Sequence, residues 1–430
     1  MLKNPSGSNS RAAFRHRPFR YYIPARFLIT VASEMQAVAV AWQIYDLTRR
    51  PLDLGLVGLA QFLPGICLFL VAGHVADRVP RQKILQVCWA SFAVCSLLLF
   101  AFTLHGLSSP LPIYVVILLN GFVRAFNAPA SQAFVPLLVP QEDFPNAIAW
   151  SSSIFQIATI TGPMLGGLIY GLTGRPTTVF ASSAAAYTLA FVLLRQVHVA
   201  AVRTPGPTSG RTVLEGLSFI WRNKIIMGAI SLDLFAVLLG GAVALLPVYA
   251  REILKIGATG LGILRCAPGV GAVLMGMVMA HWPLKRRAGL IMLWCVFAFG
   301  VFTVIFGLSH ELWISLFMLF LIGASDSVSV IVRHTMIQLS TPDEMRGRVS
   351  AVNTVFIGAS NEVGQFESGI TAQWFGTVPA VVIGGVGTMV IVAAWSALFP
   401  KLRKMDNLLP DMPVLDLPEQ SAREAGAAAD

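Results

Sequence analysis

Residues 288–308 read AGLIMLWCVFAFGVFTVIFGL, an apolar run without a charged side chain. About 20 such residues are enough for a helix to cross the hydrocarbon core of a bilayer. Eleven further stretches of similar character lie before and after this run. Their apolar residues are continuous and do not alternate with polar ones, which argues against a transmembrane β-barrel. The twelve predicted spans are 21–46, 54–76, 84–104, 112–136, 146–172, 178–198, 225–250, 257–281, 288–308, 312–336, 348–375 and 379–399.

The composition of the whole chain agrees with this interpretation. Its 430 residues are 56% hydrophobic and only 12% charged, whereas a soluble domain carries roughly 25% charged residues. So few charges cannot cover the outside of a soluble protein of this size. The composition therefore excludes an ordinary cytosolic enzyme, a disordered chain and a secreted disulfide scaffold. We predict an all-α polytopic membrane protein with twelve transmembrane helices.

The net charge of +10 is distributed as a membrane topology requires. If the N-terminus is cytoplasmic, most Lys and Arg residues fall in segments on the cytoplasmic side, in line with the positive-inside rule. Both termini are then cytoplasmic, and the basic charge needs no nucleic-acid partner. The exceptions are Arg49, Arg50, Arg175, Arg251 and Lys255 in the outer loops, and Arg26, Arg124, Arg265 and Arg333 within predicted helices.

The longest polar connection divides the spans into two groups of six. The first 20 residues lack the separate apolar core and cleavage site of a signal peptide, so we expect the first span itself to direct insertion. The five cysteines lie in apolar runs without metal-ligand spacing, and we expect neither a metal nor a cofactor. The predicted parts are a cytoplasmic tail (1–20), an N-terminal six-helix bundle (21–198), a cytoplasmic linker (199–223), a C-terminal six-helix bundle (224–400) and a disordered cytoplasmic tail (401–430).

Two separated matches indicate that one half repeats the other. Residues 58–65 read GLAQFLPG and residues 262–269 read GILRCAPG, so that Pro64 aligns with Pro268 at a shift of 204. Leu138 and the residues after it align with Leu339 and its successors at a shift of 201. Two matches at nearly one shift favour a duplicated six-helix unit, an arrangement that many secondary transporters have.

A short basic loop follows the second span, where residues 73–83 read GHVADRVPRQK. Gly73 permits a close helix approach, and Arg78, Arg81 and Lys83 anchor the loop in the cytoplasm. The loop resembles the signature loop of the major facilitator superfamily, although Pro80 and Gln82 depart from the usual pattern. The resemblance covers residues 18–400. It implies two pseudo-symmetric bundles, a monomer, and a latch in which Asp77 contacts the start of the eleventh helix near Arg346 and Arg348.

The fourth span carries a charge at mid-membrane, where residues 120–132 read NGFVRAFNAPASQ. An arginine such as Arg124 needs a partner or a wet cavity at this depth. Its position resembles that of the family's span-four arginine, which the resemblance associates with proton coupling; a purely structural role that ties helices together is equally open. This stretch, with Pro129, residues 136–140 (PLLVP) and Asn146, resembles the macrolide-efflux and enterobactin-exporter-like branch. Asn127, in the same span, is a further candidate for the cavity.

The fifth span contains a string of small residues, GPMLGG at 162–167. Gly162, Gly166 and Gly167 permit close helix packing, and Pro163 loosens the backbone. The string resembles the family's antiporter motif, although Ala158 stands where a further glycine is usual. The resemblance favours export over import.

Five acids lie within the predicted spans, where a carboxylate costs several kcal/mol unless it is paired, hydrated or protonated. Glu34 is our first choice for a protonatable substrate or coupling site; a permanent salt bridge to Arg124 is the alternative. Gln36 adds a polar group to the same helix. Asp233 could pair with Arg333 or Arg265. Asp326 lies about 10 Å along its helix from Arg333. Glu362 and Glu367 share a helix, and Glu362 is the more central of the two.

The sequence lacks the phosphate-loop, zinc-protease and nucleophile-elbow motifs. We therefore predict a secondary active transporter of the plasma (inner) membrane that is not an enzyme. Its function would be export of a drug-like or siderophore-like molecule by alternating access, coupled to protons. Glu34 and Arg124 would carry the coupling, with Asp326 and Glu362 secondary. The alternatives are a proton-independent facilitator or lipid flippase on the same fold, and a membrane-embedded enzyme or sensor.

Overall fold

The computed structural model describes residues 11–199, 210–282 and 287–405, and helices are the only regular secondary structure in these three ranges. The long helices of the first half are α1 (Arg17–Thr48), α2 (Pro51–Arg78), α3 (Arg81–Leu104), α4 (Leu111–Phe134), α5 (Phe144–Thr173) and α6 (Pro176–Arg195). Those of the second half are α8 (Lys224–Leu239), α10 (Gly257–His281), α11 (Ala288–Leu308), α12 (Leu312–Ser340), α13 (Asp343–Phe375) and α14 (Thr377–Leu398).

Shorter helical pieces extend or connect these segments. From α8 the helical path continues through η4 (Ala242–Leu245), α9 (Leu246–Val248) and the π-helical η5 (Tyr249–Ile253). The others are η1 (Ala12–Arg15), η2 (Val135–Leu137), η3 (Gln141–Asp143), α7 (Gly210–Arg222) and α15 (Pro400–Arg403). Local sequence sets such boundaries: α5 ends at Gly174, which has a φ of 65°, a conformation that glycine adopts without steric penalty.

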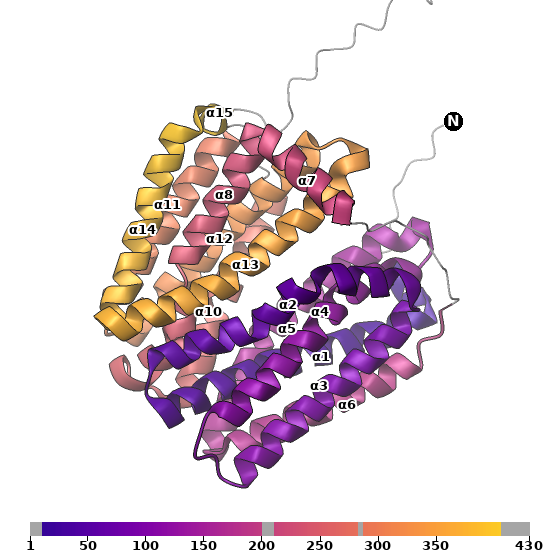
Figure 1. Cartoon of the computed structure of the whole chain (residues 1–430), viewed down its shortest axis with the longest axis vertical. Helices are drawn as coiled ribbons and strands as arrows, with labels where there is room; N and C mark the ends of the chain where they lie inside the picture. Colours follow the sequence, from indigo (N-terminus) through magenta and orange to yellow (C-terminus); the bar gives the residue numbers. More distant parts are fainter. Residues whose placement is uncertain (1–10, 200–209, 283–286, 406–430) are drawn as a thin grey trace, which may run out of the picture.

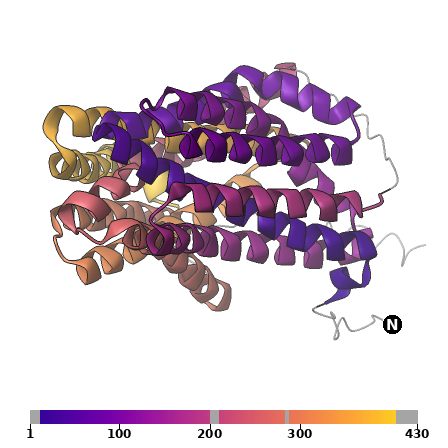
Figure 2. The same cartoon turned by 90° about the horizontal axis from the view of Figure 1, so that it is seen from below.

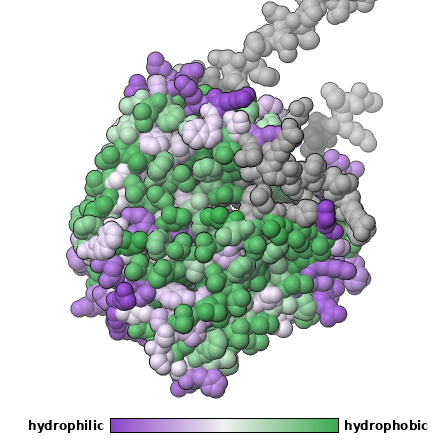
Figure 3. Space-filling model, viewed as in Figure 1, coloured by the Kyte–Doolittle hydropathy of each residue, from purple (hydrophilic) through white to green (hydrophobic). Residues whose placement is uncertain are grey.

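The helices confirm the predicted multi-pass membrane fold. Among the described residues, eleven helical segments are long and apolar enough to cross a membrane. The twelfth long helix, α13, is more polar and packs against α2 and α8, so that protein surrounds much of its surface. Hydrophobic side chains cover most of the face seen in Figure 3, with hydrophilic ones gathered toward its edges. A bilayer is the solvent that such a surface fits.

Equivalent helices of the two halves pack in the same way, as the sequence repeat predicts. In the first half α2 packs on α4 and α3 on α6; in the second, α10 packs on α12 and α11 on α14. At two of these crossings, α2 with α4 and α10 with α12, a glycine at an equivalent position lets the helices approach closely. A Cβ at Gly121 would press against the carbonyl oxygen of Gln61, and one at Gly323 would overlap the carbonyl oxygen of Pro268.

The seam between the halves is formed by two helix pairs, α5 with α10 and α2 with α13. The two halves lie side by side along this seam in Figure 1, and Figure 2 shows the long helices running along a common direction. The closest approaches bring Gly167 against Gly262 and Gly55 against Gly369. All four glycines lie toward the end of the molecule at which α1 passes into α2.

The linker helix α7 packs on the second half. Ile220 joins a buried apolar cluster with Ile226 and Val349, and Arg348 donates a hydrogen bond of 2.6 Å from Nη1 to Glu215 Oε2. The predicted linker, 199–223, therefore contains a helix anchored to α13. The predicted tails lie mostly outside the described residues, since residues 1–10 and 406–430 are not among them.

The glycine at the α10–α12 crossing can be tested with a matched pair of substitutions. We expect Gly323→Ala to lower the midpoint of thermal unfolding of the purified protein, because overpacking costs about 1–3 kcal/mol. Gly276→Ala, on α10, should leave the midpoint unchanged or slightly higher, because nothing lies within 4 Å of its Cβ position. Equal midpoints for the two variants would contradict the close approach.

Candidate functional site

Four charged side chains from four helices form a cluster between the halves, which we call the central cluster. Glu34 on α1 and Arg124 on α4 come from the first half, and Arg265 on α10 and Glu362 on α13 from the second. Each lies near the middle of its helix. Arg124 Nη1 lies 3.9 Å from Glu362 Oε1, and Glu34 lies within electrostatic reach of both arginines.

The small-residue string of α5 places Glu34. A Cβ at Gly162 would press against the Cβ of Glu34, so the stem of this acid lies directly on the glycine. Gly166 lies against the backbone of Met35, one residue further along α1. On the other side of α5, Gly167 meets Gly262 of α10. The string therefore packs α5 against α1 and against the opposite half at once.

A neighbour on the same helix orients Glu362. Gln365 donates a hydrogen bond of 3.1 Å from Nε2 to Glu362 Oε2, and Gly58 of α2 leaves room for the Gln365 side chain. The Glu362 side chain is 16% exposed, whereas that of Arg124 is 50% exposed. Arg124 therefore contacts the other half while half of its side chain stays exposed.

The central cluster is electrically balanced, with two carboxylates and two guanidinium groups. A buried charge costs several kcal/mol unless opposite charges and hydrogen bonds compensate it. The compensation here is incomplete, because Arg265 Nε is buried and has no hydrogen-bond partner in the described parts of the chain. A ligand that reaches the central cluster would meet the half-exposed Arg124 first.

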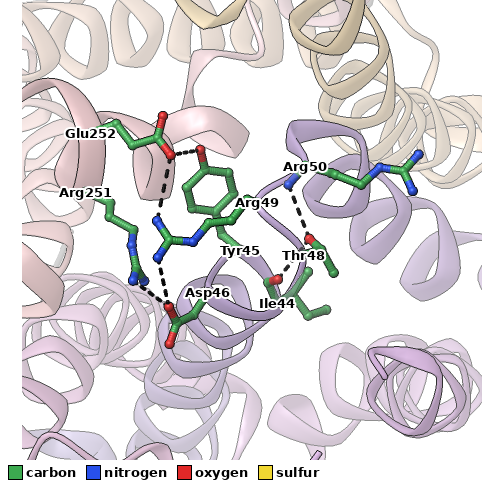
Figure 4. A network of polar contacts seen from close by, with 8 residues as sticks. All are labelled: Ile44, Tyr45, Asp46, Thr48, Arg49, Arg50, Arg251 and Glu252. Carbon is green, nitrogen blue, oxygen red and sulfur yellow. Dashed lines mark hydrogen bonds and ion pairs between the residues drawn. The ribbon is translucent and has the colours of Figure 1, made fainter. Parts of the chain in front are cut away.

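A second set of charges joins the halves at the end where α1 passes into α2, and Figure 4 shows it closely. Asp46 pairs with Arg251 of η5 at 2.5 Å. Tyr45 donates a hydrogen bond of 2.5 Å to Glu252, which also lies 4.0 Å from Arg49. We call these five residues the end network. They hold the end of α1 to the end of the seventh span.

Neither the end network nor the place of Arg265 is predicted from the sequence, in which Arg49 and Arg251 are expected only as outer-loop cations. The sequence does contain a signal for the end network. Asp46 and Glu252 lie close to those cations, at the ends of two spans that are equivalent in the repeat. Arg265 stands where the first half has Gln61, and a charge that replaces a neutral residue between repeats marks a position where the halves differ.

The residues of the predicted latch make other contacts. Arg81 donates 3.0 Å from Nη1 to the carbonyl oxygen of Ala133, and Arg346 donates 3.0 Å from Nε to that of Gln338. Arg348 pairs with Glu215 of the linker helix. Gly73 and Arg78 lie in the last turns of α2, but the side chain of Asp77 lies outside the described residues. The latch stays a prediction.

The structure separates several predicted cavity residues from the central cluster. Gln36 is buried, on the side of α1 opposite Glu34, the side on which Gln43 bonds to Thr103 of α3. Asn127 accepts a hydrogen bond of 3.0 Å at Oδ1 from Trp89 Nε1.

Two of the predicted acids lie deeper in the second half. Asp233 forms a buried ion pair with Arg333, one of the two partners considered for it. Asp326 lines a small cavity beside this pair. The Arg124 ion pair goes to Glu362 and not, as one alternative had it, to Glu34.

A family model described as transmembrane secretion effector matches residues 8–425. The chain belongs to this family of major facilitator transporters. The enterobactin exporter EntS of Escherichia coli (strain SMS-3-5 / SECEC) is 25% identical over 404 residues, which are 93% of this chain and 96% of EntS.

Solved transporter structures share the fold. A bacterial homologue of the human lysosomal transporter Spinster, inward-facing and occupied, matches with a TM-score of 0.70 and 14% identity over 90% of this chain and 99% of that one. A POT family transporter in complex with 5-aminolevulinic acid matches with a TM-score of 0.72 and 10% identity over 90% and 97%. At these identities the likeness shows the fold alone.

The end network should hold this facilitator-family transporter closed at one end. We expect Arg251→Ala to speed maleimide labelling of Cys266, which is buried at the seam and bonded to the carbonyl oxygen of Ile160. Partly exposed pairs contribute about 0.2–1 kcal/mol, so labelling should rise by up to about fivefold. Peptide mass spectrometry of the labelled protein gives the rate for each cysteine.

Two controls belong to this measurement. Cys67 is exposed, so its labelling rate should not change. Arg175→Ala removes a cation at the same end of the molecule but outside the end network, and it should leave Cys266 protected. Equal labelling of Cys266 in the Arg175 and Arg251 variants would show that the network does not hold this end closed.

Proposed function

We propose that this protein exports a siderophore-like small molecule from the cytoplasm by alternating access, in exchange for protons. The observation that carries the proposal is the central cluster, in which acids and arginines of both halves meet at mid-depth. Charges placed there are costly, and in membrane proteins such groups mark transport pathways and proton relays. Because the cluster spans the seam, any rocking of one half against the other changes its pairing.

The distribution of basic residues supports an orientation with both termini in the cytoplasm. The end network then lies on the outer side, where the seam glycines also make their closest contacts. In this orientation we take the half-exposed Arg124 to be reached from the cytoplasmic side. On this interpretation the structure is the inward-facing state of a monomeric transporter in the plasma (inner) membrane. Asp77 and the arginines around it would lock the opposite, outward-facing state.

The substrate class is supported by chemistry and by similarity. Carboxylates of the central cluster accept hydrogen bonds, and the unpartnered Nε of Arg265 donates one. A small molecule with hydroxyl donors and carbonyl or phenolate acceptors fits these groups. The relative at 25% identity is named an enterobactin exporter, and we take enterobactin as the first substrate to test.

Glu34 is the group that we assign to coupling. As a carboxylate it attracts Arg124 and Arg265, which belong to opposite halves. As a neutral acid it loses that attraction, so taking up a proton weakens a link across the seam. Substrate and proton would compete for this side chain: substrate binds the carboxylate from inside, and a proton displaces it outside.

Transport in everted membrane vesicles tests the assignment. Vesicles that contain the protein should accumulate labelled enterobactin when a respiratory substrate acidifies their lumen, and a protonophore should abolish the accumulation. Glu34→Gln keeps the size of the side chain but cannot ionise, so accumulation should fall to the level of vesicles without the protein. The readout is the labelled substrate retained on a filter.

Glu367→Gln is the matched control, because this acid also lies on a long helix but bonds to Thr371 of its own helix. It should transport like the unaltered protein. Flux that is independent of the protonophore would instead indicate a facilitator. Coupled transport that survives Glu34→Gln would remove Glu34 from the mechanism while leaving export intact.

A further inference from the structure

A small cavity lies inside the second half, between α8, α11 and α12. It measures about 10 Å³, which is about the room that one water molecule needs. Two carboxylates and two hydroxyls belong to its lining, and apolar side chains supply the rest. The lining residues are Asp233, Ala236, Val237, Val296, Phe299, Ser325, Asp326 and Ser329.

The charges around this cavity do not balance. Asp233 is neutralised by its ion pair with Arg333, in which both side chains are buried. Within the described parts of the chain, Asp326 has neither a hydrogen bond nor an ion pair. With both carboxylates ionised, this group would therefore carry one uncompensated negative charge. In this respect it differs from the central cluster, whose two acids face two arginines.

Neighbouring helices do not supply the missing cation. On α11, residues 288–308 contain no charged side chain. The arginine of α10, Arg265, has Glu34 as its electrostatic partner, and His281 lies at the far end of that helix and bonds to its own backbone. On α12 itself, His334 is exposed and follows the already paired Arg333.

Two acids near the middle of α13 have partners of their own. Glu362 pairs with Arg124, and Glu367 accepts a hydrogen bond from Thr371. Neither side chain lines the cavity. Among the described residues no cationic side chain pairs with Asp326, so a positive charge for it would come from outside the protein.

The oxygen atoms at the cavity suit a small hard cation. Ser325 and Ser329 are four residues apart on α12, so they share a face of the helix. Ser329 is 3% exposed, and its hydroxyl has no partner among the described residues. Ser329 belongs to the lining of the cavity, so an ion or a protonated carboxyl group held there would satisfy its hydroxyl.

We propose that this cavity binds a single monovalent cation, either Na⁺ or a proton, at the Asp326 carboxylate. The site is completed by the Ser325 and Ser329 hydroxyls and by the carboxylate oxygen of Asp233 that is not paired with Arg333, Oδ1. A monovalent ion brings the group to neutrality, whereas a divalent ion would leave a buried positive charge. The site is separate from Glu34, and its occupancy can be measured without any transported substrate.

Thermal unfolding of the full-length protein in nanodiscs tests the Na⁺ arm. At constant ionic strength, NaCl replaces choline chloride. A ligand that binds only the folded protein raises its midpoint in a saturable way. We expect this rise in the unaltered protein, its loss in Asp326→Asn, and its retention in Glu367→Gln.

Infrared spectroscopy of protein labelled with ¹³C-aspartate tests the proton arm. If a proton occupies the site, a protonated-carboxyl stretch should be present at neutral pH. That stretch should disappear in Asp326→Asn and stay in Asp53→Asn, since Asp53 lies on α2 and bonds to Tyr114 instead.

Either positive result supports the site and identifies its occupant. Absence of both a saturable Na⁺ effect and the protonated-carboxyl stretch would overturn the proposal. If Asp326→Asn does not fold, Ser329→Ala takes its place: it should shift the Na⁺ concentration, or the pH, at which the signal is half-maximal. No shift with Ser329→Ala would also overturn the proposal. Loss of enterobactin transport alone bears on the central cluster and not on this site.

Discussion

A charged side chain in the middle of a bilayer must find an opposite charge or water, and this requirement organises the whole interior of the protein. Arg124 finds Glu362 on the opposite half, and Glu34 finds arginines on both halves. The pairing therefore couples electrostatics to the relative position of the halves. Motion along the seam cannot leave these pairs unchanged, which gives the transporter a physical link between charge state and conformation.

Glycine is the means by which these charges come together. The α5 string lets three helices approach so closely that the Glu34 stem rests on Gly162 while Gly167 meets Gly262 of the opposite half. Larger residues would push α5 away and separate the cluster. Packing and electrostatics thus depend on the same few positions, and the small-residue motif has a function beyond helix association.

The sequence predicts the spans well, because length and apolar character are local properties that the bilayer dictates. It also predicts the repeat, since the match between residues 58–65 and 262–269 lies at equivalent helix crossings, α2 with α4 and α10 with α12. Pairing of charges is not local. The partner of Arg124 lies more than 200 residues away, and Asp46 and Arg251 meet only because two spans end at the same depth. Helical periodicity places Gln36 on the side of α1 opposite Glu34. The spacing of the two residues alone therefore predicts that Gln36 lies away from the central cluster.

The polarity of α13 has a consequence for how the protein is made. A helix with several amides and acids partitions poorly into lipid on its own. The two helices against which it packs most extensively, α2 and α8, precede it in the chain. Insertion of this segment by the translocon therefore depends on neighbours that are already in the membrane, and biogenesis of the second half is cooperative rather than helix by helix.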